Sequence, residues 1–304
     1  MQRNAISSDG TGIVFEVEGS GPPLVLLHGF AANRHCWREK GYVDRLAAAG
    51  RQIILIDARG HGSSGKPHHA AAYAPHKRAQ DTIAVLDELG LPVADLHGFS
   101  MGGWNALATA RTFPGRVRSL AINGAHGFAQ SLQPFRDALE QGMEGWIAHI
   151  ERECGRSLGS IRRAQLLSND DKALKACAAE DRRNLAGDLR DLWFPSLILC
   201  GEDELFLDAA KIFSKFMCGT FAVMRGKNHS AAFAAKDEVC DALLDFLDEL
   251  DHGRFSRLVR GERNAEVIIG ECVDARVPNF ASAPEEASQP HSEQPIAAVS
   301  PSGE

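Results

Sequence analysis

Residues 96–104 read Leu-His-Gly-Phe-Ser-Met-Gly-Gly-Trp and contain a Gly-x-Ser-x-Gly pattern centred on Ser100. An apolar run typical of a buried strand precedes the pattern, and a helix-compatible run follows it at residues 105–112. A serine on a sharp strand-to-helix turn needs neighbours without a Cβ atom, which Gly98 and Gly102 supply. The stretch therefore predicts a nucleophile elbow with Ser100 as nucleophile. The flanking elements disfavour the alternative, a glycine-rich turn with an incidental serine.

Short apolar runs recur along the rest of the chain and alternate with helical patterns. Continuous runs of this kind are typical of strands buried on both faces of a mostly parallel sheet. The alternation predicts an α/β fold with a doubly wound sheet. A further strand at residues 13–18 ends in turn-forming residues and predicts an antiparallel edge hairpin. The apolar runs occupy residues 24–27, 53–56, 93–96, 117–122, 197–199 and 221–224.

The strand signal disappears between residues 127 and 191, where the sequence is charged and helical. We expect a helical lid there, between an N-terminal core segment at residues 1–126 and a C-terminal one at residues 192–253. Residues 254–304 form a C-terminal extension. After about residue 274 it is rich in Pro, Ser, Ala and Glu, so we expect most of it to be disordered.

Composition narrows the possible partners and location. The chain has 304 residues and a net charge of -7, with no basic cluster, which argues against nucleic acid as a partner. No segment is long and apolar enough to be a signal peptide or a membrane span, which favours a cytoplasmic protein that does not bind membranes. The seven cysteines are scattered singly, so we expect reduced thiols. The oligomeric state cannot be read from the sequence.

Three motifs together resemble the α/β-hydrolase superfamily. They are His-Gly-Phe at residues 28–30, Asp-Ala-Arg-Gly-His-Gly-Ser-Ser at residues 57–64, and the elbow at residues 98–103. The resemblance covers about residues 10–250 and is closest to small esterases and lactonases such as 3-oxoadipate enol-lactonase. It implies a serine hydrolase that cleaves a small-molecule carboxylic ester or lactone. The chemistry that it implies needs no cofactor and no metal.

The resemblance also implies roles for individual residues. Backbone N–H groups of Phe30 and Met101 would form the oxyanion hole. His229, in Gly-Lys-Asn-His-Ser at residues 226–230, would be the general base. The acid would come from the loop at residues 201–206, where the family usually has Asp. The register falls on Glu204, with Asp203 as the alternative and Glu202 a distant third.

Other side chains are candidates for binding substrate. Phe128, Phe135 and Trp146 could line an apolar pocket above Ser100, although packing of the lid is their more common role. Arg59 and Lys66 could meet an anionic substrate, but charged loop residues are usually solvated.

The remaining histidines have simpler interpretations. His28 and His61 belong to turn motifs, where we expect structural roles. The adjacent His68 and His69 lie in a polar loop without nearby cysteine or carboxylate ligands, so solvated rings are expected there instead of a metal site.

Other functions stay open on the same scaffold, because a fold alone does not determine a reaction. They are carbon-carbon bond hydrolysis, acyl transfer, perhydrolysis and non-enzymatic ligand reception. Carbon-carbon hydrolases commonly have Trp after the base histidine, and residues 230–233 here read Ser-Ala-Ala-Phe, which disfavours that reaction.

Overall fold

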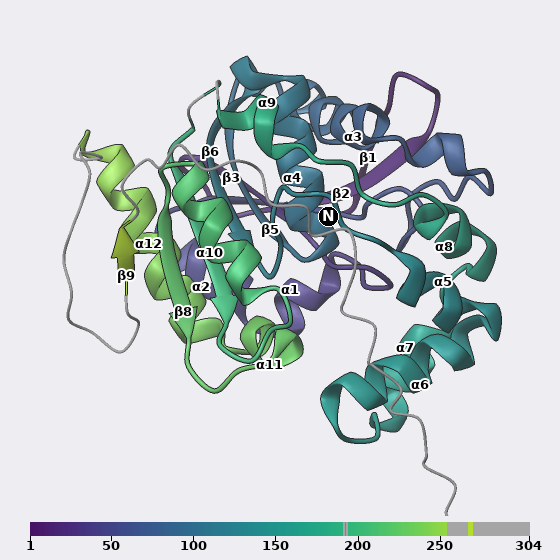
Figure 1. Ribbon diagram of the computed structural model, residues 1–304. Helices are drawn as coiled ribbons and strands as arrows, with labels where there is room; N and C mark the ends of the chain where they lie inside the picture. The colour runs from purple at the N-terminus through teal and green to yellow at the C-terminus, as the bar shows by residue number, and fades with distance from the viewer. Residues whose placement is uncertain (191, 193, 254–266, 270–304) are drawn as a thin grey trace, which may run out of the picture.

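Strands β3 to β8 are neighbours in one sheet and all run parallel, as the apolar runs predict. The computed structural model describes residues 1–190, 192, 194–253 and 267–269, and within them nine strands follow the order β1-β2-β4-β3-β5-β6-β7-β8-β9 (Figure 1). The strands are β1 Arg3–Ile6, β2 Gly12–Glu18, β3 Pro23–Leu27, β4 Gln52–Ile56, β5 Ala94–Phe99, β6 Val117–Asn123, β7 Ser196–Gly201, β8 Thr220–Met224 and β9 Val267–Ile269.

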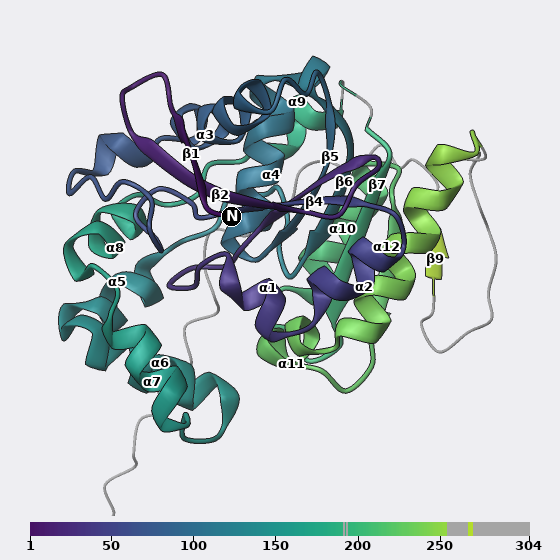
Figure 2. The same ribbon diagram turned by 180° about the vertical axis from the view of Figure 1, so that it is seen from behind.

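Alternate residues of each central strand enter different cores, one on each face of the sheet. Val25 and Leu27 of β3 join a core formed with helices α3 (Pro75–Glu88), α4 (Met101–Thr112) and α10 (Leu207–Phe216). Leu24 and Leu26 join a second core formed with α1 (His35–Glu39), α2 (Tyr42–Ala48) and α12 (Lys236–Asp251) (Figure 2). Because both faces are covered, most residues of the central strands are apolar, which explains the continuous runs.

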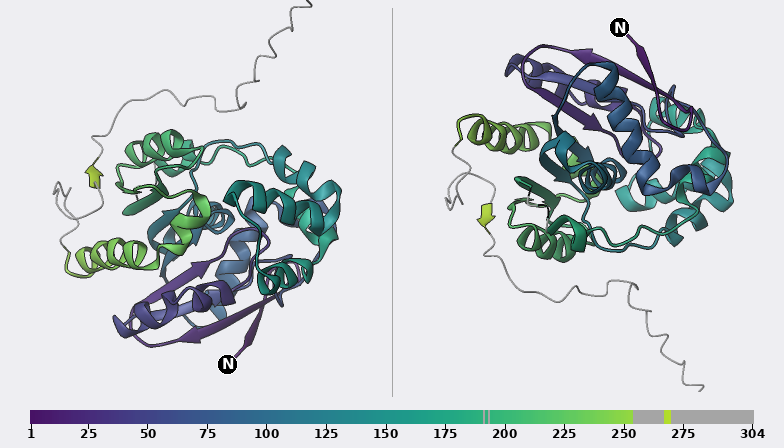
Figure 3. Two further views of the ribbon diagram at one scale, coloured as in Figure 1. Left: turned by 90° about the horizontal axis from the view of Figure 1, so that it is seen from below. Right: turned by 90° about the horizontal axis from the view of Figure 1, so that it is seen from above.

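Short helices complete the chain, and most lie between β6 and β7. Figure 3 shows this insertion at one end of the molecule, with α12 and β9 at the other. An isolated bridge between Gln130 and Arg182 joins the chain before α5 to the chain after α8, and α9 follows this bridge. The insertion contains α5 Gln133–Glu140, α6 Gly142–Cys154, α7 Ser160–Leu167, α8 Asp171–Ala178 and α9 Ala186–Arg190, and the other short helices are the 3₁₀ turns η1 Ala70–Tyr73 and η2 Pro114–Arg116 and the α-helix α11 His229–Ala234.

The two edge strands, β1 and β9, were not expected. The expected strand at residues 13–18 corresponds to β2, which pairs antiparallel with β1 on one side and with β4 on the other. β1 has no apolar run that would predict a strand, because only Ala5 among its four residues is buried. At the other edge β9 pairs antiparallel with β8. The expected disorder after about residue 274 lies outside the described residues. No described helix could span a bilayer.

Cys218 contradicts the expectation that all the thiols are reduced, because it is disulfide-bonded. The other five cysteines of the described ranges are free. Spacing along a sequence does not report which distant segments meet, so scattered cysteines alone could not predict this bond.

Replacing Gly102 with Ala should lower the free energy of unfolding by about 1–3 kcal/mol or more, because the added Cβ would overlap the carbonyl oxygen of Leu27. Urea unfolding would measure the change. Gly115→Ala is the matched control, since a Cβ there meets nothing within 4 Å. Equal stability of the two variants would contradict the close approach of α4 to β3.

Candidate active site

Ser100 occupies the turn between β5 and α4 with φ 54° and ψ -115°. This positive φ is uncommon for a residue with a side chain and is typical of strained functional sites. The turn is held by a hydrogen bond from the Ser100 N–H to the Asn123 carbonyl at 2.8 Å. A Cβ at Gly98 would overlap the Gly102 carbonyl oxygen, so the tight turn requires glycine there.

His229 and Glu204 lie in direct contact, although 25 positions separate them in the chain. His229 begins α11, after β8, and its Nδ1 is 2.7 Å from Glu204 Oε2. The Glu204 side chain is fully buried, and its second oxygen accepts a 3.0 Å hydrogen bond from the Gly201 N–H. Asp203 is exposed. Of the two carboxylates that the sequence left open, Glu204 is therefore the one that contacts the imidazole.

The imidazole of His229 lies against the residues that flank Ser100. Its ring stacks on Phe99 with 4.7 Å between centroids. A Cβ at Gly124, the residue after Asn123, would come within 2.9 Å of His229 Cε1. The fold thus brings Ser100, His229 and Glu204 to the same end of the sheet. No hydrogen bond joins the Ser100 hydroxyl to His229 among the described residues, which is common in ligand-free active sites.

Two backbone N–H groups beside Ser100 donate no hydrogen bond to any described residue, and they belong to Phe30 and Met101. Met101 is the first residue of α4, where amides have no partner within the helix. Phe30 follows Gly29, where a Cβ would lie 3.6 Å from the Ser100 Cβ. Both amides are therefore available near the serine.

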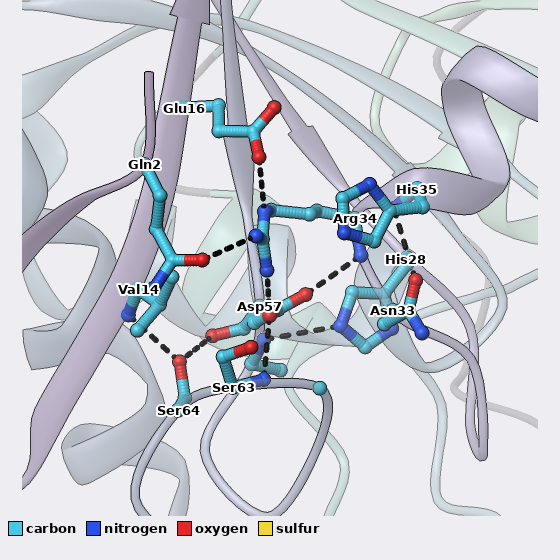
Figure 4. A network of polar contacts seen from close by, with 12 residues as sticks. Gln2, Val14, Glu16, His28, Asn33, Arg34, His35, Asp57, Ser63 and Ser64 are labelled. Carbon is cyan, nitrogen blue, oxygen red and sulfur yellow. Dashed lines mark hydrogen bonds and ion pairs between the residues drawn. The ribbon is translucent and has the colours of Figure 1, made fainter.

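A buried polar network fixes the loop that contains Phe30 (Figure 4). His28 uses both ring nitrogens, with Nδ1 2.8 Å from the Gly29 carbonyl and Nε2 accepting from the Ala58 N–H at 3.1 Å. Burial lowers the pKa of His28, so the ring stays neutral. Asp57 accepts from the Arg34 N–H at 2.7 Å and forms an ion pair with its guanidinium. His28 thus has the structural role expected from the sequence.

A pocket opens beside the two amides and is bounded by the core and the helical insertion. Phe135 contributes to its wall. Trp146 instead packs against Phe30 with 4.9 Å between ring centroids. Phe128 does not line this pocket, because it is buried in the core against Phe213. Packing, the alternative role considered from the sequence, describes Phe128 and Trp146 better.

The basic residues expected to meet an anionic substrate are already engaged. Arg59 is 1% exposed and pairs with Asp81 and Asp9. The Lys66 ammonium donates to backbone carbonyls, including that of Gly62 at 2.6 Å. The carboxylates of Asp81 and Asp9 thus neutralise Arg59, whereas Lys66 is bonded to carbonyl groups of its own loop.

The other histidines stay outside the serine site. His61 is fully buried, and its Nδ1 lies 3.0 Å from the Arg59 carbonyl. His68 is exposed and contacts Asp170 at 3.0 Å. Among the residues that the structure describes, no group of His, Cys, Asp and Glu could hold a metal ion.

Sequence reasoning missed the three arginines that line the pocket, of which Arg183 is exposed and Arg78 and Arg182 are partly buried. Arg78 lies on α3, and Arg182 lies at the bridge to Gln130. No local signal could have found them, because each stands in a charged stretch typical of solvated surface.

Comparisons with known proteins agree with this architecture. A family model of the alpha/beta hydrolase fold matches residues 22–166. The chain is 29% identical over 248 residues to the dihydrolipoyllysine-residue acetyltransferase component of the acetoin cleaving system of Pseudomonas putida, covering 77% of this chain and 65% of that protein. It is 27% identical over 231 residues to a Bacillus subtilis protein provisionally designated 2-succinyl-6-hydroxy-2,4-cyclohexadiene-1-carboxylate synthase, covering 67% and 82% respectively.

Solved structures share the same fold. An esterase from Exiguobacterium antarcticum superposes with a TM-score of 0.72 at 22% identity, covering 82% of this chain and 100% of that one. The family model covers slightly less than half of the chain, and the solved structures show that the chain has the α/β-hydrolase fold. The chain spans less than two thirds of the acetyltransferase component that it matches.

The buried His126 should make stability depend on pH. Burial, followed by the nearby charge of Arg182, lowers its pKa from 6.5 to about 4. Unfolding restores the ordinary pKa, so the stabilisation is complete above pH 6.5. It is then lost as the pH falls toward 4, at up to about 1.4 kcal/mol per pH unit.

Urea unfolding between pH 4 and 7 would measure this dependence. His126→Gln should make it shallower, although other buried histidines such as His97 keep their contribution, whereas replacing the exposed His76 with Gln should leave it as in the native chain. An unchanged slope in His126→Gln would show that this ring does not titrate on unfolding.

Proposed function

We propose that the protein hydrolyses a carboxylic ester or lactone through an acyl-enzyme on Ser100. The contact between His229 and Glu204 beside the strained serine carries this proposal, because an imidazole oriented by a carboxylate is what activates a hydroxyl nucleophile. Ser100 would be the nucleophile, His229 the general base and Glu204 the acid that orients the imidazole.

Acylation would begin when the Ser100 oxygen bonds to the substrate carbonyl carbon and its proton passes to Nε2 of His229. The Nδ1–H donates to Glu204, whose charge stabilises the imidazolium. The imidazolium then protonates the leaving alkoxide, and the ester bond breaks. Water attacks the acyl-enzyme, its proton goes to His229, and Ser100 recovers a proton as the carboxylic acid leaves.

The oxyanion formed at each attack would be bound by the N–H groups of Phe30 and Met101. Both lack a partner among the described residues and lie on backbone fixed by the buried network and by α4. Donors held in place before the reaction stabilise the transition state without reorganising, and losing one typically costs about 10²–10³ in kcat.

We further propose that residues 127–191 act as a lid that selects the substrate. The space enclosed between the insertion and the core is about 30 Å³, room for roughly two water molecules. Without movement of the lid, this volume favours short acyl groups. Two curated relatives have names that describe other reactions, so direct measurement of ester hydrolysis is the decisive assay.

The native chain should react with a fluorophosphonate probe and hydrolyse p-nitrophenyl acetate faster than longer-chain esters. Ser100→Ala should abolish labelling, and Ser100→Ala and His229→Ala should each lower kcat by about 10⁴-fold or more, since the serine and imidazole act as a unit. The exposed Ser63→Ala variant should label like the native chain. A native chain that neither labels nor turns over would favour a ligand receptor.

Replacing Glu204 with Gln should lower kcat toward p-nitrophenyl acetate by about 10⁴-fold, because an amide does not hold the required tautomer of the imidazole. Asp203→Asn is the matched control, since Asp203 is exposed and adjacent in sequence. The proposed role of Glu204 would be rejected if Asp203→Asn lost more activity than Glu204→Gln.

A further inference from the structure

Three arginines line the pocket that Phe30 and Met101 also line; Arg183 is exposed, whereas Arg78 and Arg182 are partly buried. Arg78 and Arg182, here called the arginine pair, line this pocket together with Phe30 and Met101. Their guanidinium groups are 5.9 and 6.0 Å from the ring centroid of Trp104, which forms part of the same wall. The pair therefore places two positive charges in a pocket that Met101, the residue after Ser100, also lines.

Both side chains are held in place by neutral groups. Arg78 donates to the Tyr73 carbonyl at 2.7 Å and to the Cys177 carbonyl at 2.9 Å. Arg182 donates to the Gln130 side chain at 2.7 Å, and the same two residues also exchange backbone hydrogen bonds. A guanidinium has five N–H donors, so each arginine keeps donors for another acceptor.

No carboxylate among the described residues neutralises the pair. Asp181 lines the pocket but pairs with Arg136 at 2.8 Å and accepts from the Leu132 N–H at 2.8 Å. Glu180 also lines the pocket and is exposed, without an ion pair in the described ranges. The guanidinium nitrogens of Arg78 and Arg182 that have no hydrogen-bond partner among the described residues are not fully buried. Water can therefore reach them.

This arrangement is electrostatically unfavourable without a ligand. Burial, reinforced by the positive charge of Arg78, lowers the pKa of Arg182 to about 10. Buried or half-buried charges in proteins are normally paired, and a planar guanidinium matches a carboxylate especially well. An anion entering the pocket would supply the missing counter-charge.

We propose that the arginine pair binds a carboxylate of the substrate, so that the preferred substrate is a small ester that carries a negative charge. This inference rests on the proposed hydrolysis at Ser100 and narrows its substrate class. Arg78 comes from the core and Arg182 from the insertion, so one carboxylate would bind both parts and close the pocket over the ester.

Matched ester pairs test the proposal. Acetoxyacetate carries a carboxylate on the alcohol side of the ester where acetoxyacetamide carries a neutral carboxamide. Monomethyl succinate and methyl succinamate differ in the same way on the acyl side. The native chain should prefer the anion in at least one pair by about tenfold in kcat/KM, measured by pH-stat. Arg78→Gln and Arg182→Gln should each reduce that preference about tenfold, mainly through KM.

Arg182→Lys should keep part of the preference, because it keeps the charge and loses the planar donor geometry. Arg156→Gln removes an exposed arginine of the insertion and should leave the preference unchanged. Preference for the neutral ester in both pairs, or a preference that neither glutamine variant alters, would overturn the proposal.

Binding without turnover separates this proposal from the hydrolysis on which it rests. Calorimetry with the Ser100→Ala chain should show that the anion of the preferred pair binds more tightly than its neutral amide, and Arg182→Gln in that background should remove the difference. If the native chain binds the anion selectively but cleaves no ester, the proposed hydrolysis is rejected and the proposed anion site is retained. Cleavage of the neutral esters without selective anion binding would reject the anion site alone.

Discussion

The backbone of α4 passes so close to β3 that position 102 has room for no side chain. A Cβ at Gly102 would overlap the Leu27 carbonyl, and one at Gly98 would overlap Gly102 itself. This approach forces the chain to turn abruptly after β5, and Ser100 takes the positive φ that the turn requires. The strain is borne by the packed strands on both sides, so the serine can protrude from a rigid support.

Charge in the site is divided between groups that stay neutral and groups that stay paired. The rings of His28 and His61 are sealed from water, and burial lowers the pKa of both. Asp57 and Arg34 form a buried ion pair, which holds the loop that contains Phe30 and Arg34 in place. His229 differs from these rings because its side chain is 38% exposed while its carboxylate partner is buried. The partly exposed imidazole is therefore accessible from outside the core, as its proposed role as general base requires.

The sequence predicted those features that depend on local pattern. The parallel strands could be found because burial on both faces leaves only apolar residues, and the elbow because its glycines are sterically required. Features that depend on tertiary contacts could not be found: the chain direction that buries Phe128 against Phe213, the disulfide at Cys218 and the proximity of Arg182 to Arg78. The choice between Glu204 and Asp203 needed side-chain directions, since adjacent residues point different ways.

The bridge between Gln130 and Arg182 has a consequence for how such proteins diversify. Because the chain leaves the core at residue 130 and returns to it at residue 182, helices α5 to α8 could change in length without disturbing the sheet. Exchanging these helices would alter part of the pocket wall and leave Ser100, His229 and Glu204 unchanged. Recombination at these two neighbouring positions could in this way give one ancestral fold new substrate preferences.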